Sequence, residues 1–135
     1  MITADVRLFH ERFGVPVGTR PQLLSATDFT YRLAFLREEL TELEAAHAAG
    51  DLAEVADALV DLVYVAVGTA LWAGLDFDAH WREVQRANLA KVRTPAPGAS
   101  RRGHGHDVVK PLGWRPPCHE PILLATRNAH AEVDQ

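Results

Sequence analysis

Apolar residues recur along the first two thirds of the chain at the three- and four-residue spacing of amphipathic helices. The clearest stripe begins near Ser25 or Thr27, which are both good N-cap residues, and runs to Ala49 before Gly50. Its apolar positions are Phe29, Leu33, Leu36, Leu40 and Leu43. This spacing predicts a long helix with one face packed against other helices.

Similar patterns predict a helix over Thr3–Phe13, stopped by Gly14, and another from Asp76 or Asp78 to about Val92. The second of these places four residues in register along one face: Trp81, Val84, Asn88 and Lys91. A short helix is also expected over Ile122–Ala131. Because strand-like alternation is scarce, we expect an all-α fold: an antiparallel bundle of about four main helices with an irregular C-terminal arm.

The most apolar segment follows Asp51, a helix cap with Glu54 three residues later, and ends near Gly74. It is apolar on nearly every side except at Asp57 and Asp61. Burying two ionised carboxylates one helical turn apart costs several kcal/mol each unless a cation or strong donors compensate. The pattern therefore predicts a buried helix with a charged ligand beside it.

A helix that is apolar all round needs neighbours all round, and three or four helices from one chain do not supply them. We therefore expect a homodimer or a dimer of dimers. The longest apolar run without a charge, Leu62–Leu75, is shorter than the roughly 20 residues that span a bilayer. It reads as a core helix, with no membrane as partner.

Composition adds that 135 residues suffice for one domain, with a helical bundle over residues 1–94 and a Pro/Gly-rich arm over 95–135. A net charge of −4 argues against nucleic acid as the main partner. The single cysteine, Cys118, fits a reducing compartment, and Met1–Phe13 does not read as a signal peptide, so we expect a cytoplasmic protein.

A second group of acids lies on the preceding helix, at Glu38, Glu39 and Glu42. The short connection at Gly50 predicts that the two helices pack antiparallel. Asp57 and Asp61 lie about 40° apart on a helical wheel, so carboxylates from both helices can converge on one ion. Hard oxygen ligands favour Mg²⁺, which Mn²⁺ can replace.

Plainer interpretations stay open for several of these residues. Glu38 can be a solvated surface residue and Glu54 a helix cap, while a salt bridge to Arg32 or Lys91 could explain Asp57 and Asp61.

Further along the chain, an inward Asn88 beside Lys91 suggests recognition of an anion or a base. Alternatively, Lys91 snorkels at a helix end and Asn88 satisfies backbone groups.

The C-terminal arm offers a further metal hypothesis, a zinc site formed by His104, His106, Cys118 and His119. Their spacing suits no familiar zinc motif, so chance clustering in a polar arm is the favoured interpretation.

The acidic elements resemble those of the all-α nucleoside triphosphate pyrophosphohydrolases, a MazG-like group that includes phosphoribosyl-ATP pyrophosphohydrolase and dimeric dUTPases. Residues 38–42 (EELTE) match the EExxE element, and residues 54–68 (EVADALVDLVYVAVG) resemble the second acidic helix. Residues 88–91 (NLAK) resemble the Asn-x-x-Lys element. Lys110, followed by Trp114, Pro116 and Pro117, resembles the C-terminal segment of the MazG-like branch.

The chain departs from this pattern at two points. The second motif is ExxD, which would place its glutamate at position 58, and that residue is Ala. Asp57 can replace it on the Asp61 face, or Glu54 with Asp57 forms the literal motif. Tyr64 is also followed by Val65, not by the histidine that phosphoribosyl-ATP enzymes tend to have.

The resemblance implies Mg²⁺-dependent hydrolysis of a nucleoside triphosphate to the monophosphate and pyrophosphate. It implies metal ligands at Glu39, Glu42, Asp57 and Asp61. Glu38 would orient the attacking water, with Glu39 as the other catalytic acid. Substrate contacts are expected from Tyr64, Asn88, Lys91 and Lys110. The alternative is a regulatory module that binds metal or nucleotide without turnover.

Overall fold

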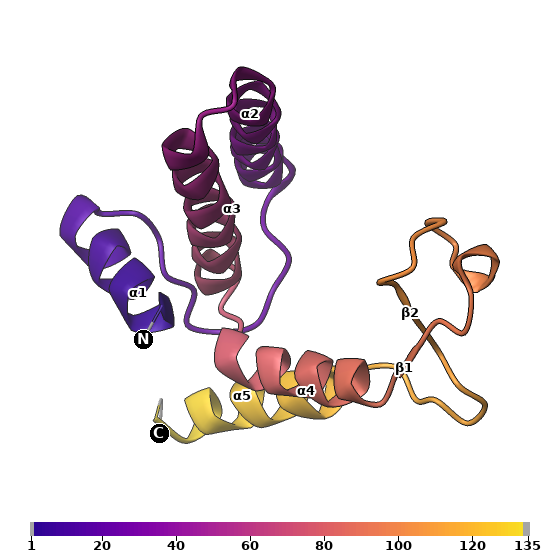
Figure 1. The fold of residues 1–135 in the computed structure, drawn as a ribbon. Helices are drawn as coiled ribbons and strands as arrows, with labels where there is room; N and C mark the ends of the chain where they lie inside the picture. Colours follow the sequence, from indigo (N-terminus) through magenta and orange to yellow (C-terminus); the bar gives the residue numbers. More distant parts are fainter. Residues whose placement is uncertain (1, 134–135) are drawn as a thin grey trace. The chain divides into compact units, whose positions relative to one another are not determined.

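The computed structural model describes residues 2–133 and is built mainly from helices (Figure 1). These are α1 (Ile2–Phe13), α2 (Ala26–Ala49), α3 (Leu52–Trp72), α4 (Phe77–Leu89) and α5 (Glu120–Val133), with a 3-10 turn at Pro97–Ala99. Two short strands, β1 (Val92–Arg93) and β2 (Val108–Val109), pair antiparallel. The expected all-α fold is confirmed.

The caps that delimit α2 and α3 are those that the sequence predicts. The Ser25 hydroxyl accepts a hydrogen bond from the backbone N–H of Asp28. Gly50 adopts a left-handed conformation (φ 71°) that most L residues avoid. The Asp51 carboxylate then accepts from the first free N–H groups of α3. The chain reverses over this turn, so α2 and α3 run side by side in opposite directions (Figure 1).

The apolar core of the first helices lies where α1 meets α3. Val6 of α1 and Val67 and Leu71 of α3 are fully buried, and Tyr64 and Phe77 pack against them. The segment between α1 and α2 is tied to the end of α3 by backbone hydrogen bonds from Gly18 to Leu71 and from Gln22 to Ala73. These bonds hold the connection of residues 14–25, called the strap below, against the end of α3 just before α2 begins.

The face that α2 buries differs from the predicted leucine stripe. Its buried residues are Arg32, Glu39 and Ala46, spaced seven apart, whereas Phe29 and Leu40 remain 54% and 49% exposed. Phe29 lines an apolar pocket together with Ala66 and Ala70 of α3, so it lies at the edge of this contact. Within one chain, α2 therefore meets α3 along a row that contains charged residues, and the leucine ridge lies at the margin of that contact.

The prediction for α4 is wrong at its C-terminal end. The helix stops at Leu89, so Lys91 lies outside it, and Asn88 is exposed instead of facing inward. The physical reason is competition for backbone partners. The β1 residues pair with β2, and the N–H of Thr94 donates to the carbonyl of Asp107. Strands of two residues are too short to show an alternating pattern in the sequence.

The chain forms two compact units, one comprising residues 1–77 with 123–135 and the other residues 78–122. The division expected at residue 94 stays a prediction. Within the second unit, the Glu83 carboxylate accepts from the Arg86 guanidinium and from the N–H of Cys118. The hydrogen bonds from Arg86, followed by that from Cys118, lower the pKa of Glu83 to about 2. The Trp114 indole donates to the carbonyl of Ala87.

By length and apolar composition alone, α3 could cross a membrane. Core helices of soluble proteins meet the same criterion, and α3 carries Asp57 and Asp61 and is the helix that both α1 and α2 contact. Only 33% of its apolar window is buried within the single chain, so the expected role of α3 as a core helix stays a prediction.

Two left-handed glycines allow a matched test of the strap. Gly74 has φ 69°, and a Cβ there would lie 2.3 Å from the carbonyl oxygen of Arg20. Gly14 has φ 68°, but a Cβ at this position would have no described atom within 4 Å. Gly14→Ala should lower the free energy of unfolding by about 1 kcal/mol, and Gly74→Ala by about 3 kcal/mol because backbone overlap adds to the strain. Urea denaturation measures both, and equal losses would contradict the close approach.

Candidate active site

Glu39 is a buried acid at the contact between α2 and α3. Only 6% of the residue is exposed, and its Oε2 atom is buried with no hydrogen-bond partner among the described residues. Burial raises the pKa of Glu39 above its ordinary value, and the charges of Glu42, Asp61, Glu38 and Asp57 raise it further, in that order. An unpaired buried carboxylate among four others is unstable without a positive charge.

The four neighbouring acids come from both helices. Glu38 and Glu42 flank Glu39 on α2 and are exposed, while Asp57 is exposed and Asp61 half-buried on α3. Across residues 2–133, no three His, Cys, Asp or Glu side chains are close enough together to hold a metal ion. The backbone thus brings the acids within electrostatic range of Glu39, and convergence on one ion would require rotation of their side chains.

The salt-bridge interpretation of the α3 aspartates receives no support. Among the described residues, neither Asp57 nor Asp61 forms an ion pair with Arg32 or Lys91. Arg32 instead donates to α3 itself, from Nε to the Thr69 hydroxyl (3.0 Å) and from Nη2 to the carbonyl of Val65 (2.8 Å). Arg32 and the two aspartates therefore do not neutralise one another.

A cavity of about 570 Å³ opens beside Glu39 and Asp61, within the range typical of small-molecule sites. Helices α1, α2 and α3 all contribute to its walls, and its lining is mainly aromatic. The aromatic residues are Phe9, Phe13, Tyr31, Phe35 and Tyr64. The rings of Phe9 and Tyr64 meet edge to face, with centroids 5.5 Å apart. A flat apolar ring could therefore lie next to the carboxylates.

Two polar residues, His10 and Arg32, also line this cavity, and both are buried. The Nδ1 of His10 lies 3.0 Å from the carbonyl oxygen of Pro16. The Arg32 guanidinium lies 5.6 Å from the ring centre of Phe35 and 6.0 Å from that of Tyr31. Burial lowers the pKa of Arg32 from its ordinary value. The site therefore holds fixed donors as well as carboxylates.

A family model described as phosphoribosyl-ATP pyrophosphohydrolase matches residues 6–88, which is more than half of the chain. The chain belongs to the phosphoribosyl-ATP pyrophosphohydrolase family. A search of curated proteins found no match. Membership of this family indicates a pyrophosphohydrolase that acts on nucleotides, as the acidic motifs implied. The matched range contains Glu39, the four acids around it and all the residues that line the aromatic cavity.

Two of the predicted substrate contacts, Lys91 and Lys110, lie beyond the part of the chain that matches the phosphoribosyl-ATP pyrophosphohydrolase family. The Lys91 ammonium donates to the Asn88 amide oxygen (2.8 Å). The ammonium groups of Lys91 and Lys110 lie 5.9 and 4.4 Å from the ring centre of Trp114. The second unit thus gathers these three polar residues around one indole, as a local cationic cluster.

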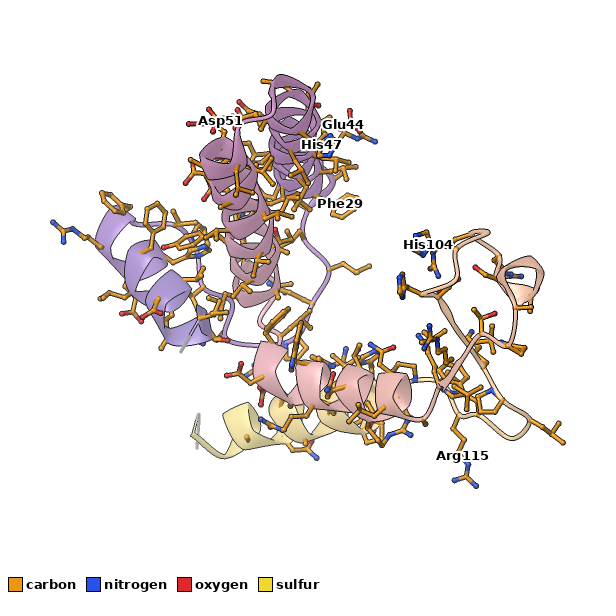
Figure 2. The ribbon with its side chains drawn as sticks, viewed as in Figure 1. Phe29, Glu44, His47, Asp51, His104 and Arg115 are labelled. Atoms are coloured by element: carbon orange, nitrogen blue, oxygen red, sulfur yellow. The ribbon has the colours of Figure 1, made fainter. Side chains whose placement is uncertain are left out.

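The histidines suggested as zinc ligands fall into separate pairs. His104 lies in the loop between β1 and β2 (Figure 2), where its ring is 5.3 Å from that of His106. His119 instead meets His80 of α4, with Nδ1 atoms 2.9 Å apart. Consistently, the described chain contains no metal-binding group of three such side chains.

Sequence reasoning found the acids and Tyr64 but missed His10, Arg32 and the other aromatic residues of the cavity. The signal for Arg32 was its position seven residues before Glu39, which places both on one helical row. His10 follows Val6 by one helical turn and shares its buried face. Neither signal indicates which partner helix the row will contact. The match to the family gives a range of residues and does not identify those that line a cavity.

The raised pKa of Glu39 predicts how stability depends on pH without metal. The folded chain binds this proton more tightly than the unfolded chain, so ionisation destabilises the fold at neutral pH. The cost disappears as the pH falls through the folded pKa toward the ordinary value of 4.5. Glu39→Gln should therefore raise the unfolding free energy in EDTA at pH 8 by about 1 kcal/mol, with the difference vanishing near pH 4.5.

Urea denaturation at several pH values measures this difference. Glu44→Gln is the matched control, since Glu44 is exposed on the same helix (Figure 2) and should change little. A Glu39→Gln effect that is independent of pH would contradict the assigned electrostatics.

Proposed function

We propose that the protein is a Mg²⁺-dependent nucleoside triphosphate pyrophosphohydrolase of the cytoplasm. It would convert a ribo- or deoxynucleoside triphosphate and water to the monophosphate and pyrophosphate. This reaction would remove unwanted nucleotides from the cellular pool. The observation that carries the proposal is the buried, unpartnered Oε2 of Glu39 beside an aromatic cavity. Membership of the family indicates a pyrophosphohydrolase that acts on nucleotides, without specifying the triphosphate or the metal.

The acids fit a divalent cation because their oxygens are hard ligands and the Oε2 of Glu39 has no hydrogen-bond partner in the described part of the chain. Glu39, Glu42, Asp57 and Asp61 would hold Mg²⁺, or Mn²⁺ in its place. When bound, the ion would neutralise phosphate charge and lower the pKa of a coordinated water. The backbone N–H of Glu54 donates to the Asp51 carboxylate, while the N–H of Asp51 donates to Ala46, so whether the Glu54 side chain acts as a cap or as a ligand stays a prediction.

The remaining steps fall to other residues of the chain. Glu38 is exposed next to Glu39 and would accept the proton of the attacking water as general base. Tyr64 would contact the base from the cavity wall. By resemblance, Lys91 and Lys110 would bind phosphate oxygens and Asn88 the sugar or a phosphate.

One observation favours a second candidate, a regulatory module that binds metal or nucleotide without turnover. Ala58 occupies the motif position of a glutamate and is only 4% exposed, so the site has one carboxylate fewer there. Product analysis separates the two candidates, because a regulatory module would bind nucleotide without releasing pyrophosphate.

The decisive experiment combines turnover with metal binding. Wild-type protein with Mg²⁺ should release pyrophosphate from at least one nucleoside triphosphate, and Mg²⁺ should raise its melting temperature. Glu39→Gln should lose both, with turnover reduced at least about a hundredfold, while circular dichroism stays helical. Glu44→Gln should keep both. Unchanged turnover in Glu39→Gln would refute the assigned role.

We also propose that two copies associate, as a homodimer or a dimer of dimers, through the faces that one chain leaves open. Helix α3 exposes Leu59, Val60 and Val63, which border an apolar groove of about 370 Å³ between α1 and α3. Exposed apolar area of this kind on a helix supports association.

Sedimentation tests this assembly. Wild-type protein should sediment as a dimer or tetramer, whereas Val60→Asp should be monomeric and still helical, because 62% of Val60 is exposed in the single chain. Leu112→Asp, at a fully exposed position outside that face, is the control and should not change the sedimentation of the protein. A monomeric wild type would overturn the proposal.

A further inference from the structure

Arg32 is a buried cation with donors to spare. Only 6% of the residue is exposed, yet no carboxylate among the described residues pairs with it. Its two hydrogen bonds use Nε and Nη2. Nη1 donates to no described residue and is not sealed from solvent. Because Arg32 lines the aromatic cavity, this free end of the guanidinium can meet an acceptor there.

His10 supplies the complementary acceptor. A carbonyl oxygen cannot donate, so the contact between Nδ1 and Pro16 places the ring proton on Nδ1. In the neutral ring, Nε2 is then left with a lone pair. His10 is 2% exposed and lines the same cavity as Arg32.

Gly68 brings these two groups to one place. A Cβ on Gly68 would lie 2.7 Å from the Nε2 of His10 and 3.1 Å from the Nη2 of Arg32. Both atoms therefore approach the same point on the surface of α3, and only a residue without a side chain leaves room for them. The cavity thus places the guanidinium of Arg32 beside the Nε2 atom of His10.

We propose that His10 and Arg32 read the edge of the nucleobase and select bases with a lactam edge, in which a carbonyl adjoins a ring N–H. The carbonyl oxygen accepts from Arg32 and the ring N–H donates to His10. Uracil, thymine, guanine and hypoxanthine have this edge. Cytosine and adenine carry an amino group in place of the carbonyl, which would set donor against donor at Arg32. The inference rests on the proposed function, because it assumes that the cavity holds the base.

The physical basis is the cost of an unmatched group in a buried site. Hydrogen bonds to a charged donor are roughly twice as strong as neutral ones. A site built around a specific donor rejects an analogue that leaves the donor unpaired, by about 1–3 kcal/mol. This corresponds to roughly tenfold to a hundredfold in kcat/KM. Phosphoribosyl-ATP carries an adenine-type base, so the inference departs from the substrate in the family's description.

Two matched pairs of substrates isolate the edge. Deoxyinosine and deoxyadenosine triphosphates differ only in the edge at position 6 of a purine, and deoxyuridine and deoxycytidine triphosphates differ in the same way on a pyrimidine. Wild-type protein should favour the lactam member of both pairs by at least about tenfold in kcat/KM, mainly through KM. Arg32→Met should reduce both ratios to near one. Arg37→Met, at an exposed position of α2, should leave them unchanged.

Binding of non-hydrolysable α,β-imido analogues of the two pyrimidines, measured by calorimetry, keeps this test separate from turnover. One outcome is that the uracil analogue binds more tightly than the cytosine analogue, with a difference that Arg32→Met removes, while no nucleotide is hydrolysed. In that case the proposed function fails and the proposed base selection stands. Three results would overturn the proposed base selection. These are equal kcat/KM for both members of a pair, a higher kcat/KM for the amino member, or a ratio that is unchanged in Arg32→Met. If Arg32→Met is unfolded by circular dichroism, Arg32→Lys replaces it and should lower both ratios severalfold.

Discussion

The site depends on the contact between α2 and α3, where α2 turns a row with two charged side chains toward an apolar helix. Arg32 and Glu39 lie seven residues apart on that row, and neither neutralises the other. Arg32 donates hydrogen bonds to α3 and lies near the rings of Tyr31 and Phe35, whereas the Oε2 of Glu39 has no hydrogen-bond partner among residues 2–133. The contact therefore leaves a carboxylate and a guanidinium donor without partners among the described residues. A ligand with a positive charge for Glu39 and a hydrogen-bond acceptor for Arg32 would supply both.

The same arrangement orders the cavity from one end to the other. The residues that α2 contributes follow one another along the helix about one turn apart, Arg32 first, then Phe35 and then Glu39. A nucleotide has a matching order, with an anionic chain at one end and a flat ring with a polar edge at the other. This correspondence joins the coarser conclusion from family membership to the proposals about metal and base.

Much of the fold could be predicted from sequence because its signals are local. Ser25, Gly50 and Asp51 set the bounds of α2 and α3 through caps that act within a few residues. The inward row of α2 could not be predicted in this way. The leucine spacing indicated one face, but the observed contact buries the neighbouring row with Arg32 and Glu39. Which of two adjacent rows is buried depends on the partner helix, which a helical wheel does not contain.

The candidate site was predictable to a similar degree. The acids around Glu39 were found because carboxylates in an apolar setting demand an explanation, and their positions relative to an ion stay a prediction. His10 and Arg32 were missed, because their significance arises only when Gly68 lets α1 and α2 approach the same spot on α3. The two-residue strands were missed as well, since they pair residues 15 and 17 positions apart and have no alternating pattern.

The origin of the cavity walls has a consequence for how such a protein can diversify. Helix α1 contributes Phe9, His10 and Phe13 to the lining but neither Glu39 nor any of the four acids around it. If the proposed function is correct, changes in this first helix can alter which nucleotides fit while all five acids stay in place on α2 and α3. Arg32 of α2 also lines the cavity, so only the part of substrate selection that α1 carries can diverge independently of the acids.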